Sequence, residues 1–268
     1  MATRNCLACE RELTGEIVSL EHAIPQWLAK EIELPGVSLR HFVHDECKAD
    51  DALIRSHQLN TFGSKKICRI CNNGWMSSLE SAAKPLILDL MHGRTSILAL
   101  TDVARLTLSR WAVKTTFMIA VLQTIQYELP WTIFQMLGKR ENDGPNGCFV
   151  FGTQQPGLPK GFLHTCLADL FSEGQFFQVR VGFSVHQLHF VVVIPIVKAL
   201  RAVKTSGMVH VPLWPLDLRV LATYKKIPES FESSYRFNDY LTNLVEAGAV
   251  SKNGVHLEVI EANPAVAV

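Results

Sequence analysis

Two C-x-x-C pairs place the strongest constraint on how this chain of 268 residues can fold. Cys6 and Cys9 form the first pair, and Cys68 and Cys71 form the second. Two such pairs in one chain are typical of zinc sites in which four thiolates surround the metal. We therefore expect one closed, structural Zn2+ site, with no open position for water, that joins two segments far apart in the sequence.

The composition indicates a globular protein from a reducing compartment. Hydrophobic residues make up 48% of the chain and charged residues 19%, which is enough for a substantial core. The segment 1–10 lacks the apolar stretch of a secretory signal, and the apolar segment 111–124 is interrupted by Lys114. We therefore expect a soluble, cytoplasmic protein without a membrane segment, whose paired cysteines bind metal rather than form disulfides.

The pattern of apolar residues divides the chain into two parts. Residues 1–93 are irregular and rich in Cys and His, whereas residues 94–268 are more apolar, so we place a domain boundary in the segment 92–96. Pro85 should kink or divide the helix expected around it. We expect an α+β fold, because helices and strands come in blocks rather than alternating. The expected strands are 16–20, 37–43, 53–61, 148–153, 176–183, 187–196 and 208–214, and the expected helices are 24–32, 73–91, 101–125, 130–137, 162–171 and 231–247.

The residues beside the cysteines form a second motif. Between the pairs, the segment SLEHAIPQWL contains Glu21 and His22, followed by Pro25. The second pair, in CRICNNGWM, is followed at once by Asn72. This order resembles the zinc-knuckle branch of the HNH, or ββα-metal, endonucleases, and the resemblance covers about residues 6–91.

The resemblance implies a particular domain organisation. Residues 1–93 would form a zinc-braced ββα-metal module, treble-clef-like, with two strands and a helix. Residues 94–268 would form a larger mixed α+β domain that serves dimerisation, substrate recognition or regulation. The segment WAVKT, residues 111–115, is also similar, in a weaker match, to the region that follows the nuclease module in this family.

The resemblance also implies roles for five polar residues. His22 would be the general base. Glu21, where many family members have Asp, would bind or orient a catalytic Mg2+ or Mn2+, and Asn72 would be a ligand of the same cation through its side-chain oxygen. Asn73 would take that role if the register shifts by one residue. The sequence departs from the family at the middle Asn, because the nearest candidate is Asn60, eight positions before the second cysteine pair, which would fix the loop that aims the histidine.

The chemistry of phosphodiester hydrolysis explains why these residue types occur together. The reaction needs an activated water, in-line geometry and positive charge for the leaving oxygen. A neutral histidine can take the proton from water near neutral pH, and a divalent cation held by oxygen ligands can stabilise the leaving 3′-oxygen. The resemblance therefore implies a metal-dependent endonuclease that acts on DNA, of the kind found in restriction or phage defence.

The charge distribution limits how the chain would hold DNA. Lys65, Lys66 and Arg69 make a small basic cluster beside the second cysteine pair, and on the family interpretation they would contact phosphates. The net charge of the whole chain is only +1, and residues 1–95 contain 11 Lys and Arg against 12 Asp and Glu. A module this neutral would bind DNA weakly by itself, so a homodimer or a targeting protein would supply further affinity.

Two alternatives compete with the nuclease hypothesis. The unclear position of the middle Asn favours a non-catalytic, zinc-braced module that binds nucleic acid, whereas the near-neutral charge favours a partner-binding protein. Glu80 leaves a related choice open: it follows Asn72 at helical spacing, so it either joins the cation site or is an exposed helix carboxylate.

Overall fold

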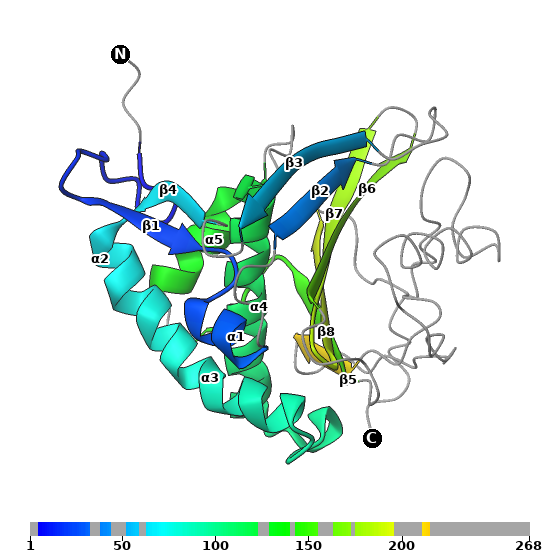
Figure 1. Cartoon of the computed structure of the whole chain (residues 1–268). Helices are drawn as coiled ribbons and strands as arrows, with labels where there is room; N and C mark the ends of the chain where they lie inside the picture. The colour runs from blue at the N-terminus through cyan, green and yellow to red at the C-terminus, as the bar shows by residue number, and fades with distance from the viewer. Residues whose placement is uncertain are drawn as a thin grey trace, which may run out of the picture.

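The computed structural model describes residues 5–32, 38–43, 52–58, 63–122, 129–139, 143–154, 163–172, 175–195 and 211–214. These residues form a helical region beside a larger β-sheet, with two smaller strand pairs, which confirms the α+β class (Figure 1). Within the described residues, no helix combines the length and the apolar character needed to cross a membrane. The helix expected over 231–247 lies outside the described residues.

The N-terminal part is built on a pair of antiparallel strands followed by a helix. Val18 pairs with Cys68 at one end of the strand pair, and His22 pairs with Gly63 at the other. The first strand begins and ends two residues later than the sequence pattern predicts, and His22 is its last residue. The elements are β1 (Val18–His22), α1 (Gln26–Glu31), β4 (Gly63–Cys68), α2 (Arg69–Cys71), a π-helical turn (Asn72–Met76) and α3 (Ser77–Met91).

The helix that follows β4 differs from the predicted one. It runs from Arg69 to Met91 and leaves helical geometry at Gly74, where φ is −90° and ψ is −115°. Pro85 lies inside α3 without dividing it, so the division that was one of the two predicted effects does not occur. Pro85 and Ser81 are both exposed, and the Ser81 carbonyl that loses its helical partner can therefore accept from water.

A second strand pair lies between α1 and β4 in the sequence. Strands β2 (Ser38–Val43) and β3 (Ala52–Gln58) are antiparallel, with Ser38 opposite Gln58 and Val43 opposite Ala52. This pair confirms the strands predicted over 37–43 and 53–61.

The long helix α4 (Asp102–Leu122) is the centre of the molecule. The hydroxyl of Thr101 accepts a hydrogen bond from the backbone N–H of Ala104 at 3.3 Å and so caps the start of the helix expected over 101–125. Residues 108–120 are all buried. The helix lies between α3 and the large sheet and also contacts α5 (Trp131–Lys139), so these elements cover its buried part, whereas its first residues are exposed (Figure 1).

The large sheet has five antiparallel strands in the order β6-β7-β8-β5-β9. The helix predicted over 162–171 was wrong, since this segment is β6 and pairs with β7 from Leu163 opposite Val185 to Ser172 opposite Gln175. Pairing along the whole length of a neighbouring strand overrides the local helical pattern. The strands are β5 (Phe149–Gln154), β6 (Leu163–Ser172), β7 (Gln175–Val185), β8 (Leu188–Pro195) and β9 (Val211–Trp214), so four of the predicted strands are confirmed.

One cluster of buried hydrophobic residues extends across the segment 92–96. It includes Ile87 of α3 together with Trp111 of α4, whose ring makes edge contacts with Phe183 and Phe190 at centroid distances of 5.7 and 5.6 Å. The two parts of the chain therefore share a core.

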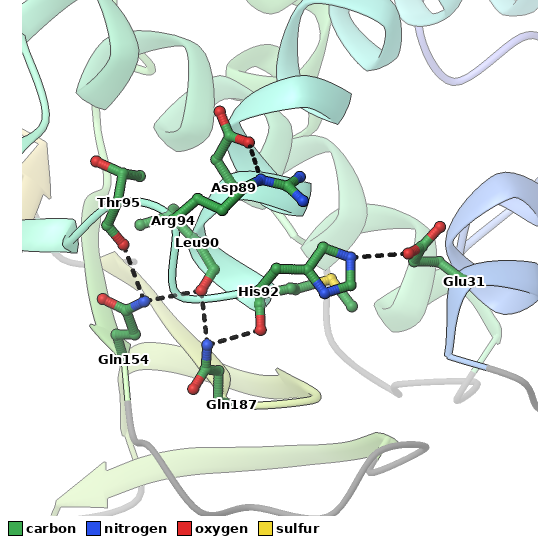
Figure 2. A network of polar contacts seen from close by, with 9 residues as sticks. Glu31, Asp89, Leu90, His92, Arg94, Thr95, Gln154 and Gln187 are labelled. Atoms are coloured by element: carbon green, nitrogen blue, oxygen red, sulfur yellow. Dashed lines mark hydrogen bonds and ion pairs between the residues drawn. The ribbon is translucent and has the colours of Figure 1, made fainter.

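Polar contacts reinforce this shared core at the end of α3 (Figure 2). The amide of Gln187, in the turn between β7 and β8, donates to the carbonyls of Leu90 and Met91 at 2.7 and 2.6 Å. Gln154 of β5 donates to Leu90 at 2.7 Å and to Thr95 at 3.1 Å. The sheet thus satisfies carbonyl groups that the end of a helix leaves without helical partners.

Candidate metal centre and the adjoining polar site

The four cysteines of the two pairs lie together. The sulfur atoms of Cys6, Cys9, Cys68 and Cys71 are all within 4.8 Å of one another, and the Cys9 and Cys68 sulfurs are 3.7 Å apart. A tetrahedral zinc ion with Zn–S bonds of about 2.3 Å requires sulfur–sulfur distances of about 3.8 Å. The four thiols therefore fit a metal ion such as Zn2+, as the sequence predicted.

Backbone groups shape this cysteine cluster. Glu10 adopts a positive φ of 63° and donates its N–H to the Cys6 carbonyl at 2.8 Å, which closes the turn around the first pair. The N–H of Cys68 points at the Cys6 sulfur at 3.2 Å, and the N–H of Cys71 points at the Cys68 sulfur at 3.4 Å. Such donors stabilise thiolates, which are the metal-binding form.

The surroundings of the thiols shift their pKa values in different directions. Burial raises the pKa values of Cys6 and Cys71. Burial also opposes ionisation of Cys68, but hydrogen bonds from Cys71 and the neighbouring thiols outweigh it, so the pKa of Cys68 is lowered. Thiols this close ionise together only with a cation among them, so metal binding here releases protons.

The cysteine cluster joins the start of the chain to the strand pair. Leu7 donates its N–H to the Lys66 carbonyl at 3.0 Å, and Arg69 donates to the Ile17 carbonyl at 2.7 Å. A metal in the cluster would therefore brace β1, β4 and the start of the following helix as one unit.

His22 lies at the end of β1, beside this braced unit. It is partly exposed, and the side-chain nitrogen of Gln26 lies 3.3 Å from its Nε2. Its strand partner is Gly63, where an added Cβ would come within 2.9 Å of the Glu21 carbonyl oxygen and of the Leu20 side chain. The register also shifts between Ser19 and Glu21, and such irregularities re-aim side chains. The chain therefore approaches itself closely where His22 is placed.

Asn72 links the helix to the same strand. Its side-chain nitrogen donates to the Ser19 hydroxyl at 2.8 Å and to the Leu20 carbonyl at 3.2 Å. Asn72 is partly buried, whereas Asn73 is exposed. Asn72 thus ties the start of the helix to β1, two residues before His22.

Glu21 does not face solvent with His22. Its side chain is buried and forms an ion pair with the ammonium of Lys114, which also contacts Glu80 at 2.6 Å. The Lys114 side chain is 0% exposed, Glu21 is 6% exposed and Glu80 is 22% exposed, so the cluster lies in the interior. Glu80 is therefore not the exposed helix carboxylate that one alternative required.

Lys114 is the polar residue that the sequence interpretation missed as part of this site. Its signal was a single lysine within an apolar helical segment, which served as evidence against a membrane segment and as part of the weak WAVKT match, but not as a member of the site. A lysine in such a position requires buried carboxylates to offset its desolvation. The carboxylates come from β1 and α3, and their meeting with α4 depends on the tertiary fold.

The pKa shifts in this cluster follow from burial and from the pairing of one ammonium with two carboxylates. Burial raises the pKa of Glu21, and the ammonium of Lys114 offsets only part of this effect. Burial lowers the pKa of Lys114, but Glu21 and Glu80 outweigh burial and the pKa is raised overall. The lysine is therefore charged, and Glu21 takes up a proton at a higher pH than an ordinary glutamate does.

The remaining candidate residues are placed as follows. Lys65, Lys66 and Arg69 are all exposed beside the cysteine cluster, as phosphate contacts would require. Asn60 lies outside the described residues, so its role stays a prediction. Glu21 belongs to β1 and Asn72 adjoins it, but Glu21 contacts Lys114 while the Asn72 amide group contacts the β1 backbone.

Comparisons with family models, curated proteins and solved structures found no match to this chain.

Proposed function

We propose that this chain is a metal-dependent, HNH-type endonuclease that hydrolyses phosphodiester bonds of DNA. The observation that supports the proposal best is the ββα arrangement around the cysteine cluster. His22 ends β1, the paired strand β4 leads into the second cysteine pair, and the helix that follows carries Asn72 back to β1. A zinc ion in the cluster would keep this arrangement rigid and would take no part in the reaction.

His22 is the proposed general base. Its partial exposure allows a substrate to reach it, and Gln26 provides a neighbouring amide that can orient the ring. A neutral imidazole would take a proton from the attacking water. General-base catalysis requires this water to lie within hydrogen-bond distance of the imidazole nitrogen.

A divalent cation, Mg2+ or Mn2+, would supply positive charge for the leaving oxygen. Asn72 fits as a ligand because its amide nitrogen is used by β1, which leaves the amide oxygen for a cation. Glu21 does not fit in the described arrangement, since its carboxylate is buried against Lys114. We therefore assign the cation to Asn72 and to oxygen atoms of the DNA phosphate.

The exposed basic residues Lys65, Lys66 and Arg69 would contact the DNA backbone. Three cations on a nearly neutral module give weak affinity, which favours a homodimer or a targeting partner in a restriction or phage-defence setting.

A cutting assay tests the proposal. Purified protein is incubated with supercoiled plasmid in Mg2+, in Mn2+ and in EDTA. We expect His22→Ala to lower the cutting rate by about 100- to 10,000-fold while folding and zinc content stay unchanged. His92→Ala is the matched control. His92 is half-exposed, lies away from the site, and pairs with Glu31 at a distance of 2.8 Å. The proposed nuclease activity is refuted if the wild type does not cut in any divalent cation, or if His22→Ala cuts as fast as the wild type.

A second candidate is a zinc-braced module that binds nucleic acid or a partner without catalysis. The ion pair of Glu21 with Lys114 favours it, because it removes a carboxylate that a cation site would use. The same preparation separates the two candidates: this one binds DNA or a partner protein in a gel-shift or pull-down experiment but leaves the plasmid intact.

A further inference from the structure

We propose that Lys114 of α4 is a positioning residue that holds Glu21 on the inner face of β1 and so directs His22 outward. This inference rests on the proposed nuclease function and adds to it a residue from outside the ββα module. It assigns Glu21 a role that does not involve a divalent metal ion.

The contacts of Lys114 connect three elements. The Lys114 side chain projects from α4 and is wholly buried, and its ammonium pairs with Glu21 of β1 and Glu80 of α3. Helix α4 also contacts α3 and β4 directly, so the lysine is fixed by the packing of its own helix. The ammonium therefore holds the end of β1 against a rigid support.

The geometry of a strand transmits this contact to His22. Adjacent side chains of a β-strand point to opposite faces, so a Glu21 side chain drawn into the core turns the next side chain toward solvent. Burial agrees, since Glu21 is buried and His22 is partly exposed. Asn72 holds the backbone of Leu20 on the other side of Glu21. A slip of one residue in this strand would exchange the two faces and bury His22.

Packing alone does not account for a lysine at this place. Thirteen consecutive residues of α4, 108–120, are buried, and a methionine would fill a similar volume without the cost of desolvating an ammonium. The charge has a defined task only toward Glu21 and Glu80 among the described residues, and Glu21 is the neighbour of the proposed base. The site around His22 is thus completed by a residue beyond the segment 92–96.

The test compares Lys114→Met, Glu21→Gln and Arg105→Met with the wild type. Arg105→Met is the matched control, because it removes another ion-paired cation of α4, whose partner is Asp102. Two readouts are used: kcat and KM on plasmid, and the imidazole signals of His22 in 1H–13C NMR spectra of histidine-labelled protein, assigned by their loss in His22→Ala.

We expect Lys114→Met and Glu21→Gln each to shift the His22 signals and to lower kcat by about 10- to 100-fold with little change in KM and with full zinc content. The double variant should be no worse than Lys114→Met alone, because the lysine acts through Glu21. Arg105→Met should leave both readouts as in the wild type.

The outcomes separate this inference from the proposed function. Unchanged His22 signals in folded, zinc-loaded Glu21→Gln and Lys114→Met overturn it, whether or not the protein cuts DNA. If Lys114→Met does not fold, Glu21→Gln decides alone. If the wild type does not cut, the nuclease proposal fails, and the His22 signals still decide whether Lys114 positions this residue.

Discussion

Removal of the Lys114 ammonium should destabilise the protein in a manner that depends strongly on pH. In Lys114→Met the buried carboxylate of Glu21 loses its ion-pair partner, and Glu80, which is 22% exposed, adds a second negative charge nearby. Breaking a buried ion pair from one side costs about 3–5 kcal/mol, because an uncompensated charge remains.

Protonation of Glu21 sets an upper limit to this cost. With an ordinary pKa of about 4.3, a glutamate costs about 1.4 kcal/mol per pH unit to protonate, which is about 3.7 kcal/mol at pH 7 and about 1 kcal/mol at pH 5. Burial already raises the pKa of Glu21 with Lys114 present, and loss of the ammonium raises it further. A raised carboxyl pKa destabilises the folded state above the unfolded pKa and not below it, so the penalty shrinks as the pH falls.

Urea unfolding followed by tryptophan fluorescence at pH 7 and pH 5 measures both values. We expect a loss of about 3 kcal/mol at pH 7 and at most about 1 kcal/mol at pH 5 for Lys114→Met. The triple variant with Glu21→Gln and Glu80→Gln should recover most of the stability at pH 7, since no charge is left unpaired. Arg105→Met, whose partner Asp102 is 74% exposed, should change stability by less than about 1 kcal/mol at either pH. Equal losses for Lys114→Met at the two pH values would refute the electrostatic reasoning.

Three further predictions concern other parts of the structure. Cys68→Ser should abolish bound zinc, measured by mass spectrometry of the metal, and lower the thermal midpoint, whereas Cys148→Ser, at a buried thiol outside the cluster, should keep the zinc. Gly63→Val should destabilise the fold by about 1–3 kcal/mol in urea, because its Cβ would lie 2.9 Å from the Glu21 carbonyl oxygen; a change within error would contradict the close approach. Gln187→Ala should cost about 1–3 kcal/mol by leaving the buried Met91 carbonyl without its side-chain donor, while Leu90 keeps its hydrogen bond from Gln154, and hydrogen exchange should rise in the last turn of α3 if this account is right.

Local patterns predicted the features that depend on local chemistry. The two cysteine pairs predicted the cluster, because the spacing of each pair places its two thiols on one turn and four thiols share one ion. The helices expected over 24–32 and 101–125 begin within two residues of the observed starts, Gln26 and Asp102, since Pro25 and Thr101 act within one turn.

Features that depend on distant neighbours were mistaken or missed. The segment of β6 carries a local pattern compatible with a helix, and only its pairing with β7 decides for a strand. Pro85 does not divide α3, whereas the helix leaves helical geometry at Gly74, two residues after the Asn72 side chain that bonds to β1. The partners of Lys114 lie 93 and 34 positions away in the sequence, so no window along the chain reveals them.

The two fixed ends of the helix that runs from Asn72 to Met91 have a mechanical consequence. Asn72 ties one end to β1, and Gln154 and Gln187 tie the other to the large sheet (Figure 2). The 15 residues of α3 span about 22 Å, so the helix acts as a strut between the polar site and the sheet. We therefore expect a displacement of β5 and of the β7–β8 turn to move the start of this helix beside β1, and the non-helical backbone at Gly74 to absorb part of that displacement.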